Sequence, residues 1–430
     1  MTSGSGTRRY RDAKGRPVVV VTGMGLVTSV GRSVDETWAA MRAGRSGIRR
    51  ITRFPIDGLR TTIAGTVDFM GVEPYSGPDL CFEMARSAAQ EALDQAGHTT
   101  GEFRGPLYLA TPPAELEWEQ RIALRKAPLD CSKTGYPRLM AAARTGHFRH
   151  VFERYQFASV ADRLAGHIGS RGLPISVSTA CASGASAIQL GVEAIRRGDT
   201  DLAISVGTDS SVQLESLIRF SLLSALSTCN DQPEKASRPF SKTRDGFVMA
   251  EGAGAVVLES LESAMARSAE ILGVVSGCGE KADDYHRTRS RPDGSAIIGA
   301  IRNAISDADL APDAIDYVNA HGTSTPENDK MECLSLYAVM GERASTVPVS
   351  SIKSMIGHTL SAAGAIEAVI SLLSLQRGVL LPTINYDEPD PDIALDVVPN
   401  EARSARIRHV LSNSFGFGGQ NVSLVLSCAD

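Results

Sequence analysis

The sequence predicts an α/β fold in which helices cover sheets that are buried on both faces. Apolar segments with strand character alternate with segments of helical periodicity along the whole chain of 430 residues. The first strand segment, Val18–Thr22, consists only of β-branched residues, which is typical of a strand covered on both faces. Since strands and helices alternate and do not fall into separate blocks, we expect layers of helix packed on sheet.

The remaining elements follow in chain order from this first strand. Gly23–Gly25 is predicted to turn the chain. Ser33 and Glu36 then have capping-box spacing, which begins a helix that ends near Gly44. Further strands are predicted at Leu202–Val206, Ala255–Leu258, Ile271–Val275, Tyr317–Asn319, Val347–Ser350 and Val422–Leu426. Further helices are predicted at Ala185–Arg197, Ala296–Ile305 and Ala362–Leu375, the last of them buried.

The order of these elements also hints at an internal duplication. Each half of the chain begins with an apolar strand, at Val18–Val21 and Ile271–Val275. Each half closes with a strand that glycine introduces, at Gly254–Leu258 and Gly418–Leu426. Such echoes are also common in α/β proteins that are not duplicated. The pattern by itself therefore leaves a duplication and a single α/β array equally open.

We divide the ordered chain into two halves at residue 262. Residues 1–16 are polar and basic and are predicted to be a disordered leader, followed by an N-terminal half at 17–262 and a C-terminal half at 263–430. Segment 103–165 interrupts the first half, because it is rich in arginine and aromatic residues, carries two adjacent prolines and has no clear period. We expect it to be an excursion that forms a cap or a dimer interface. Its basic residues suit either an acidic partner or a solvated face.

Composition and charge exclude several classes of protein. The net charge of −5 gives no reason to expect nucleic acid or an anionic membrane as a partner. The first residues lack the apolar core of a signal peptide, and no apolar run approaches the roughly 18 residues that span a bilayer. The seven cysteines are scattered without CxxC spacing, so we expect no metal site and no disulfide framework. These observations favour a cytoplasmic protein.

The sharpest candidate for chemistry is Cys181, in the segment S-T-A-C-A-S-G at residues 178–184. An apolar strand runs into small residues there, and a helix with Ile188 and Val192 on one face begins at once. The first turn of a helix offers unpaired amides and partial positive charge, which favour a thiolate. The alternative is a buried structural cysteine, the usual fate of this residue. The turn between strand and helix favours a nucleophile.

Three further segments combine polar side chains with glycines that let a ligand come close to the backbone. His321 follows a strand in N-A-H-G-T-S-T-P-E-N-D, where ligands of α/β sheets usually bind. Lys353 and His358 lie in K-S-M-I-G-H, a segment that also follows a predicted strand. Residues 413–421, N-S-F-G-F-G-G-Q-N, place backbone N–H groups and two aromatic rings in one turn. Taken singly, each segment is explained as well by a satisfied strand-end histidine or by ordinary turn chemistry.

Together and in this order, the four segments resemble the motifs of the β-ketoacyl-acyl carrier protein synthases of the elongating type. The similarity runs from about Val18 to the C-terminus and is strongest over 237–427, where the chain resembles synthase II. The resemblance implies an α/β thiolase fold, with duplicated halves in five layers α-β-α-β-α, assembled as a homodimer. It implies an acyltransferase that works with acyl carrier protein in fatty acid biosynthesis. No cofactor is implied, since the substrates are carried on phosphopantetheine.

The resemblance also implies a role for each matching residue. Cys181 takes the acyl group, and His321 and His358 stabilise the enolate left when a malonyl thioester loses carbon dioxide. The backbone amides of Cys181 and Phe417 form the oxyanion hole. The other matching residues are Lys353 and Glu332 as the pair that organises the histidines, Thr288, Thr323 and Thr325 at the pantetheine arm, and Phe220 and Phe417 as lining and gate of the acyl pocket.

Two features bear on the branch of the family. A histidine at 358 fits elongating synthases, whereas initiating synthases have asparagine there and thiolases need a second cysteine that 413–421 lacks. The family's glycine-rich turn near the acyl pocket is replaced by Thr111–Trp118, whose two prolines cannot reproduce it. A specialised condensing enzyme for polyketide or very-long-chain acyl groups is therefore an alternative to fatty acid elongation. A non-catalytic chain-length partner subunit is a further alternative, although that class typically replaces the cysteine.

Overall fold

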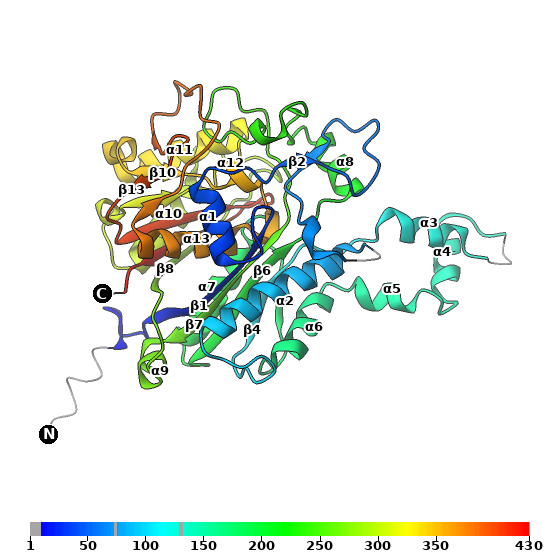
Figure 1. Ribbon diagram of the computed structural model, residues 1–430, viewed down its shortest axis with the longest axis horizontal. Helices are drawn as coiled ribbons and strands as arrows, with labels where there is room; N and C mark the ends of the chain where they lie inside the picture. The colour runs from blue at the N-terminus through cyan, green and yellow to red at the C-terminus, as the bar shows by residue number, and fades with distance from the viewer. Residues whose placement is uncertain (1–9, 73–74, 129–131, 430) are drawn as a thin grey trace.

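The structure is a computed structural model, and it describes residues 10–72, 75–128 and 132–429. A central sheet of eleven strands runs through the body of the described chain (Figure 1). The sheet consists of two halves, which meet where β1 (Val19–Thr28) pairs with β8 (Gly273–Ala282). This junction is short, because only Val20 and Val21 pair with β8.

Both halves of the sheet have the same strand order and the same directions. From β1 outward the N-terminal half runs β7 (Gly252–Ser260), β6 (Leu202–Asp209), β4 (Leu107–Ala110) and β5 (Ile175–Val177). From β8 outward the C-terminal half runs β15 (Gln420–Ser427), β14 (His409–Phe415), β9 (Tyr317–Asn319) and β10 (Pro348–Ser350), with β12 (Asp396–Val397) added at its edge. In each half the first two pairings are antiparallel and the next two parallel. Identical topology establishes the duplication that the sequence pattern left open.

Helices complete five layers. Helices α7 (Ser183–Arg196) and α13 (Ala363–Arg377) form the middle layer, since each contacts strands of both sheet halves. Helix α2 (Gly77–Gln95) covers the outer face of the N-terminal half together with α6 (Ser159–Ile168), and α10 (Ser295–Asp307) with α11 (Pro326–Met340) covers the C-terminal half. The predicted five-layer fold with duplicated halves is confirmed. Every residue from Ala363 to Leu375 is buried, as predicted for this helix.

Helices α7 and α13 approach each other so closely at two glycines that a side chain at either position would clash. A Cβ atom on Gly184 of α7 would lie 2.5 Å from the backbone nitrogen of Ala365. A Cβ atom on Gly364 of α13 would lie 2.5 Å from the backbone nitrogen of Ala185. The two glycines thus occupy matching positions in the two halves. This contact brings the amino ends of α7 and α13 together at the centre of the molecule.

The predicted turn at Gly23–Gly25 is wrong. Strand β1 continues through both glycines to Thr28, with a bulge between Val21 and Gly23. A Cβ atom on either glycine would lie 1.9 Å from a carbonyl oxygen of α2, so the glycines allow close packing of the helix on the strand. The predicted helix start is confirmed: α1 spans Val34–Arg42, and the Oγ of its N-cap residue Ser33 accepts a hydrogen bond from the backbone N–H of Glu36 at 3.3 Å.

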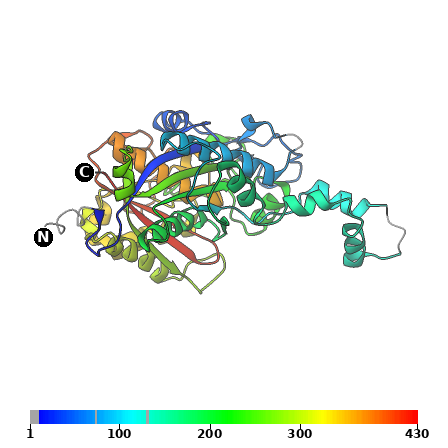
Figure 2. The same ribbon diagram turned by 90° about the horizontal axis from the view of Figure 1, so that it is seen from below.

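An arm projects from the body between β4 and α6. The arm is defined here as residues 112–158, and it carries α3 (Trp118–Lys126), α4 (Gly135–Ala143) and α5 (Arg149–Arg154) (Figures 1 and 2). The predicted excursion at 103–165 was too wide, because β4 and most of α6 fall inside it and pack in the core of the N-terminal half. The mixed composition of the arm had hidden these flanking elements.

The remaining elements lie at the periphery of the body or border the site. They are β2 (Arg49–Arg50), β3 (Ile63–Ala64), α8 (Leu214–Leu222), α9 (Leu261–Ala266), α12 (Lys353–Ile356), β11 (Val379–Leu380), β13 (Arg403–Ser404) and the short 3₁₀ turns Asp68–Met70, Pro233–Lys235, Pro312–Ala314, Gly341–Ser345 and Leu360–Ala362. Of the predicted leader, residues 1–9 lie outside the described residues. Residues 10–16 are ordered on the body, where the Arg16 guanidinium donates to Asp307 at 2.6 Å. Across the described ranges, we find no helix long and apolar enough to cross a membrane.

Candidate active site

A cavity of about 1040 Å³ lies where the parallel strands of the two sheet halves end. Residues that follow β5, β9 and β10 line it, namely Cys181, His321 and His358. Parallel strands direct their carboxyl ends to one edge of a sheet, and ligands of α/β proteins bind at that edge. Residues distant in sequence therefore meet because the duplicated halves place these strand ends side by side.

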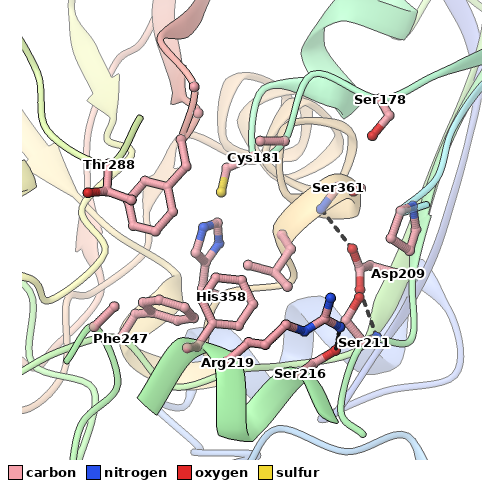
Figure 3. Close-up of a pocket in the computed structure, with 18 of the residues that line it drawn as sticks. Ser178, Cys181, Asp209, Ser211, Ser216, Arg219, Phe247, Thr288, His358 and Ser361 are labelled. Carbon is pink, nitrogen blue, oxygen red and sulfur yellow. Dashed lines mark hydrogen bonds between the residues drawn. The ribbon is translucent and has the colours of Figure 1, made fainter. Parts of the chain in front are cut away.

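Cys181 occupies a tight turn between β5 and α7. The preceding residue, Ala180, has φ +49°, a left-handed conformation that is costly for a residue with a Cβ atom. Ser183 holds the turn, since its Oγ accepts from the Thr179 N–H at 2.8 Å and donates to the Ala180 carbonyl at 2.6 Å. The result is a side chain only 8% exposed whose sulfur points into the cavity beside the His358 ring (Figure 3).

The charge state of Cys181 differs from the sequence prediction. Burial raises the pKa of the thiol to about 12, although the positive charge of Lys353 and a hydrogen bond from the Phe417 N–H act in the opposite direction. The predicted resting thiolate is therefore wrong. The helix N-terminus was expected to dominate, but the cost of burying the charged thiolate exceeds its effect.

The two histidines lie edge to face. Their ring centroids are 5.3 Å apart at 85°, and both side chains are nearly inaccessible to solvent. Phe415 packs against His321 and Phe247 against His358 in the same manner. Burial lowers the pKa of each ring well below its usual value, and the nearby charge of Lys353 lowers it further. Both imidazoles are therefore neutral at physiological pH.

The buried charges behind the histidines make separate contacts. Glu332 of α11 accepts the backbone N–H groups of His321 at 2.9 Å and Gly322 at 2.8 Å, so it fixes the loop that carries the first histidine. Lys353 forms its ion pair with Glu367 of α13 and not with Glu332. Lys353 and Glu332, expected together to organise the histidines, therefore do so through separate contacts. Burial raises the pKa of both glutamates to about 7.

Sequence reasoning missed Glu367 as part of the site. Its only signal was a carboxylate inside an otherwise apolar helix. A carboxylate in the middle layer requires a buried cation, because an isolated ion in the protein interior is strongly unfavourable. Lys353 supplies that cation, and the pair connects α12 with α13 beneath the two rings.

The glycine-rich loop between β14 and β15 covers the sulfur. Gly418 and Gly419 both have φ +90°, a conformation that residues with a Cβ atom rarely adopt. This turn directs the Phe417 N–H toward the thiol, where it donates a hydrogen bond. The Phe417 side chain lines the cavity. The C-terminal half therefore contributes the Phe417 amide at the Cys181 sulfur and the Phe417 ring in the cavity wall.

The remaining predicted residues line the cavity from both halves of the chain. Thr288, Thr323 and Thr325 follow β8 and β9 of the C-terminal half, with the hydroxyls of the last two 2.9 Å apart. Phe220 belongs to α8 of the N-terminal half and packs edge to face against Phe247. Eight of the ten predicted site residues thus line the cavity, and the two exceptions, Lys353 and Glu332, lie behind the histidines.

Polar residues that the sequence did not single out also line the cavity. Asp209, at the end of β6, is fully buried and accepts the backbone N–H groups of Ser211 at 2.8 Å and Ser361 at 3.0 Å (Figure 3). Burial raises its pKa to about 6. Arg219 of α8 forms a bidentate pair with Glu115 at the root of the arm. The arm root therefore replaces the family's glycine turn as one wall of the cavity.

A duplicated five-layer fold with a cysteine at one helix start, opposed by two neutral histidines, defines a condensing enzyme of the thiolase fold. Comparison with known families identifies the branch. The model for the N-terminal domain of beta-ketoacyl synthase matches residues 16–264, and the model for the C-terminal domain matches 272–387. The chain belongs to the β-ketoacyl synthase family, and it is an acyltransferase.

Individual relatives agree with this assignment. The chain is 38% identical over 421 residues to 3-oxoacyl-[acyl-carrier-protein] synthase 2 of Coxiella burnetii, which covers 95% of this chain and 98% of the relative. It is 36% identical to the tetracenomycin polyketide synthase ketoacyl synthase alpha subunit of Streptomyces glaucescens, with 95% and 96% covered. A solved β-ketoacyl synthase from Burkholderia phymatum superposes with a TM-score of 0.82 at 32% identity, covering 96% of this chain and all of the other.

Proposed function

We propose that this protein catalyses the decarboxylative condensation of an acyl-enzyme thioester with malonyl-acyl carrier protein, which yields 3-oxoacyl-acyl carrier protein in fatty acid elongation. The observation that carries the proposal is the meeting of Cys181, two neutral imidazoles and the Phe417 N–H in one cavity. The family membership and the names of the curated relatives agree with this reaction.

In the first half-reaction the Cys181 sulfur attacks the carbonyl of an acyl thioester. The oxygen of the tetrahedral intermediate accepts hydrogen bonds from two backbone N–H groups, those of Cys181 and Phe417. The proton that the Cys181 thiol loses in this step ends on the sulfur of the departing carrier. Collapse of the intermediate releases the carrier thiol and leaves the acyl group on Cys181.

In the second half-reaction malonyl thioester loses carbon dioxide and forms an enolate. A neutral histidine can donate one hydrogen bond to the enolate oxygen, and two such donors are already fixed in the cavity. The Nδ1 atoms of His321 and His358 are buried and have no hydrogen-bond partner among the described residues. Because a buried Nδ1 atom cannot reach a substrate, we assign donation to the Nε2 atoms. The enolate carbon then attacks the acyl carbonyl, and the Cys181 thiolate leaves.

The remaining residues hold substrate or organise the donors. Thr288, Thr323 and Thr325 are assigned to the phosphopantetheine arm, because they bring hydroxyl groups to the lining of the cavity. Phe220 and Phe417 are assigned to the acyl pocket and its gate. Lys353 and Glu332 act as positioning residues. No cofactor enters these steps.

The same proposal includes the setting of the reaction. Acyl carrier protein delivers both substrates, and the enzyme acts as a homodimer in the cytoplasm. Five free cysteines among the described residues, at positions 81, 181, 229, 278 and 333, fit a reducing compartment. The solved ketosynthase that carries a hexaketide, with a TM-score of 0.85 at 32% identity, was determined together with its acyl-carrier protein.

A second candidate function is condensation in a specialised pathway such as polyketide synthesis. The charged side chains Asp209, Arg219 and Glu115 among the lining residues favour an oxygenated acyl chain over a saturated one, since a saturated chain offers these groups no hydrogen bond in place of water. The non-catalytic partner subunit is less well supported, because the cysteine and both histidines occupy one cavity.

A ladder of acyl carriers tests the proposal and separates its two forms. Purified protein is offered acyl-carrier thioesters of increasing length, saturated and oxygenated, together with malonyl carrier, and products are identified by mass spectrometry. Extension of saturated chains by two carbons is expected for fatty acid elongation. Extension of only oxygenated chains would establish the specialised role, and absence of condensation with every carrier would overturn the proposal.

A further inference from the structure

A second, smaller cavity lies between the loop that follows β1 and the loop that follows α1. Its volume is about 360 Å³, which is within the range of small-molecule sites. Within the described chain it shares no lining residue with the catalytic cavity. The charged residues of its lining are Arg32, Arg45, Arg49 and Glu36, a net charge of +2 on a chain whose net charge is −5. We call this cavity the arginine groove.

The carboxylates nearest in sequence do not neutralise these arginines. Glu36 Oε2 accepts the backbone N–H of Arg32 at 2.9 Å, so this carboxylate closes the first turn of α1. Asp35, the neighbouring acidic residue, pairs with an arginine at the end of α13. Among the residues that the structure describes, Arg32, Arg45 and Arg49 have no ion pair with a carboxylate. Like charges around one groove repel each other, so the cluster is most stable with an anion between them.

Two of the three guanidinium groups are held in place before a ligand binds. Nη2 of Arg49 donates to the carbonyls of Ser29 and Thr66, each at 2.9 Å, which leaves its Nε and Nη1 atoms for a ligand. The Cζ atom of Arg32 lies 4.7 Å from the centroid of the Phe69 ring, a cation–π contact. Donors that are already positioned lose less conformational freedom when they bind. The groove is therefore preorganised on these two sides.

The composition of this region favours a phosphate group as the anion. Residues 30–62 contain seven arginines, no lysine and three acidic residues. The planar fork of a guanidinium donates two parallel hydrogen bonds to phosphate oxygens, which an ammonium group cannot do. A phosphate monoester carries a charge of about −2 at neutral pH, and this charge matches the +2 of the lining. The Phe69 ring adds an apolar wall against which an organic group can lie.

From these observations we propose that the arginine groove binds a phosphate monoester. The phosphate lies between Arg32, Arg45 and Arg49, and the organic part of the ester packs against Phe69. This site lies outside the condensation chemistry, because the catalytic residues line the other cavity.

The groove lies behind the segment that leads to His358. The Gly47 N–H donates to the Met355 carbonyl at 2.8 Å, and the Ser29 hydroxyl donates to the Ile356 carbonyl at 3.4 Å. Both carbonyls belong to the end of α12, which precedes His358 in the chain. A ligand in the groove holds together the two loops that support α12. Because it binds only the folded chain, it should raise the melting temperature of the protein.

Calorimetric titration with phenyl phosphate tests the proposal. This probe carries the two parts that the groove accommodates, a phosphate dianion and a flat ring. One molecule should bind per chain, more tightly than inorganic phosphate, since only the ester contacts Phe69. Arg45→Gln should raise the dissociation constant at least about tenfold, as expected for the loss of one charge-assisted pair. Arg45→Lys should give an intermediate constant, because an ammonium group keeps the charge but not the fork.

Two matched variants serve as controls. Arg50 is exposed on β2 and lies outside the groove, whereas Arg289 lines the catalytic cavity. Arg50→Gln and Arg289→Gln each remove one positive charge, and both should leave the dissociation constant unchanged. The Arg45 side chain is exposed and has no hydrogen bond or ion pair among the described residues, so Arg45→Gln should melt at the wild-type temperature without ligand.

Four results would overturn the proposal. The first is an absence of saturable binding of phenyl phosphate. Equal weakening by Arg50→Gln and Arg45→Gln would show attraction to general surface charge. Weakening by Arg289→Gln and not by Arg45→Gln would place the phosphate in the catalytic cavity. If acyl carrier protein bound through Arg45 while phenyl phosphate did not, the groove would be a protein docking surface.

Discussion

The two halves of this molecule share one topology but contribute different chemistry. In the N-terminal half, β5 leads into α7, and Cys181 lies at the start of that helix. In the C-terminal half, β10 leads toward α13, and His358 lies six residues before Gly364, whereas Cys181 lies three residues before Gly184. His321 follows β9, the counterpart of β4, whose own end leads into the arm. Duplication thus produced two equivalent helices, of which one follows the nucleophile and the other a hydrogen-bond donor.

This difference shows why the site lies between the halves. The middle helices meet through Gly184 and Gly364, so their amino ends are held within one cavity. Burial then has opposite effects on the two kinds of group. It raises the pKa of the Cys181 thiol and lowers those of the histidines, because the charged form is disfavoured in each case. Both groups are consequently neutral in the resting site.

Removal of the nucleophile should have the largest effect. Cys181→Ala is expected to lower condensation on the order of 10⁶-fold, as for nucleophiles of other covalent catalysts. Decarboxylation of malonyl carrier should persist, because both histidines remain. Product formation and carbon dioxide release are measured on the same sample. Condensation at the wild-type rate would refute the assignment of Cys181.

Loss of either histidine should affect decarboxylation, which belongs to the second half-reaction. His321→Ala or His358→Ala is expected to slow decarboxylation by about 10²–10³-fold, the usual effect of removing one donor to a developing oxyanion. Cys181 should still accept an acyl group, which mass spectrometry of the intact protein detects. If acylation were lost while decarboxylation survived, the roles of the two halves would be reversed.

The contact between the halves can be tested through stability. Gly184→Ala and Gly364→Ala each place a Cβ atom 2.5 Å from a backbone nitrogen, so each should lower the free energy of unfolding by about 1–3 kcal/mol. Gly166→Ala on α6 is the matched control, since no atom lies within 4 Å of its Cβ position. That control should be neutral or slightly stabilising. Urea unfolding monitored by circular dichroism measures all three variants, and full stability of both middle-helix variants would exclude the close contact.

The neutral state of His358 predicts a pH dependence of smaller size. Its folded pKa lies well below 6.5, so below pH 6.5 the unfolded chain binds a proton that the folded protein does not. The stability of the wild type relative to His358→Gln should therefore fall as pH is lowered from 7 to 5, by up to about 1.4 kcal/mol per pH unit. Glu332 and Glu367 act in the opposite direction, because their pKa values are raised, but they are present in both proteins. A pH-independent difference would indicate that the ring is charged.

Much of the fold followed from local patterns. The apolar strands and the buried helix at 363–375 were predicted close to their observed bounds, because burial on both faces selects continuous apolar segments. Gly23 and Gly25 were misread, since a glycine needed for helix packing looks the same in sequence as a glycine needed for a turn. Strand β4, before the arm, was missed because the segment around it is rich in arginine and aromatic residues and has no clear period.

The residues that carry the chemistry could be identified from local sequence, because Cys181, His321, His358 and the glycine loop stand in distinctive surroundings. How these residues act on one another became clear only from the folded chain. Lys353 pairs with Glu367 and not with Glu332, and the thiol is protonated although it lies before a helix. Ion pairing and desolvation depend on which groups share a buried volume, and that volume exists only after residues far apart in the chain have packed together.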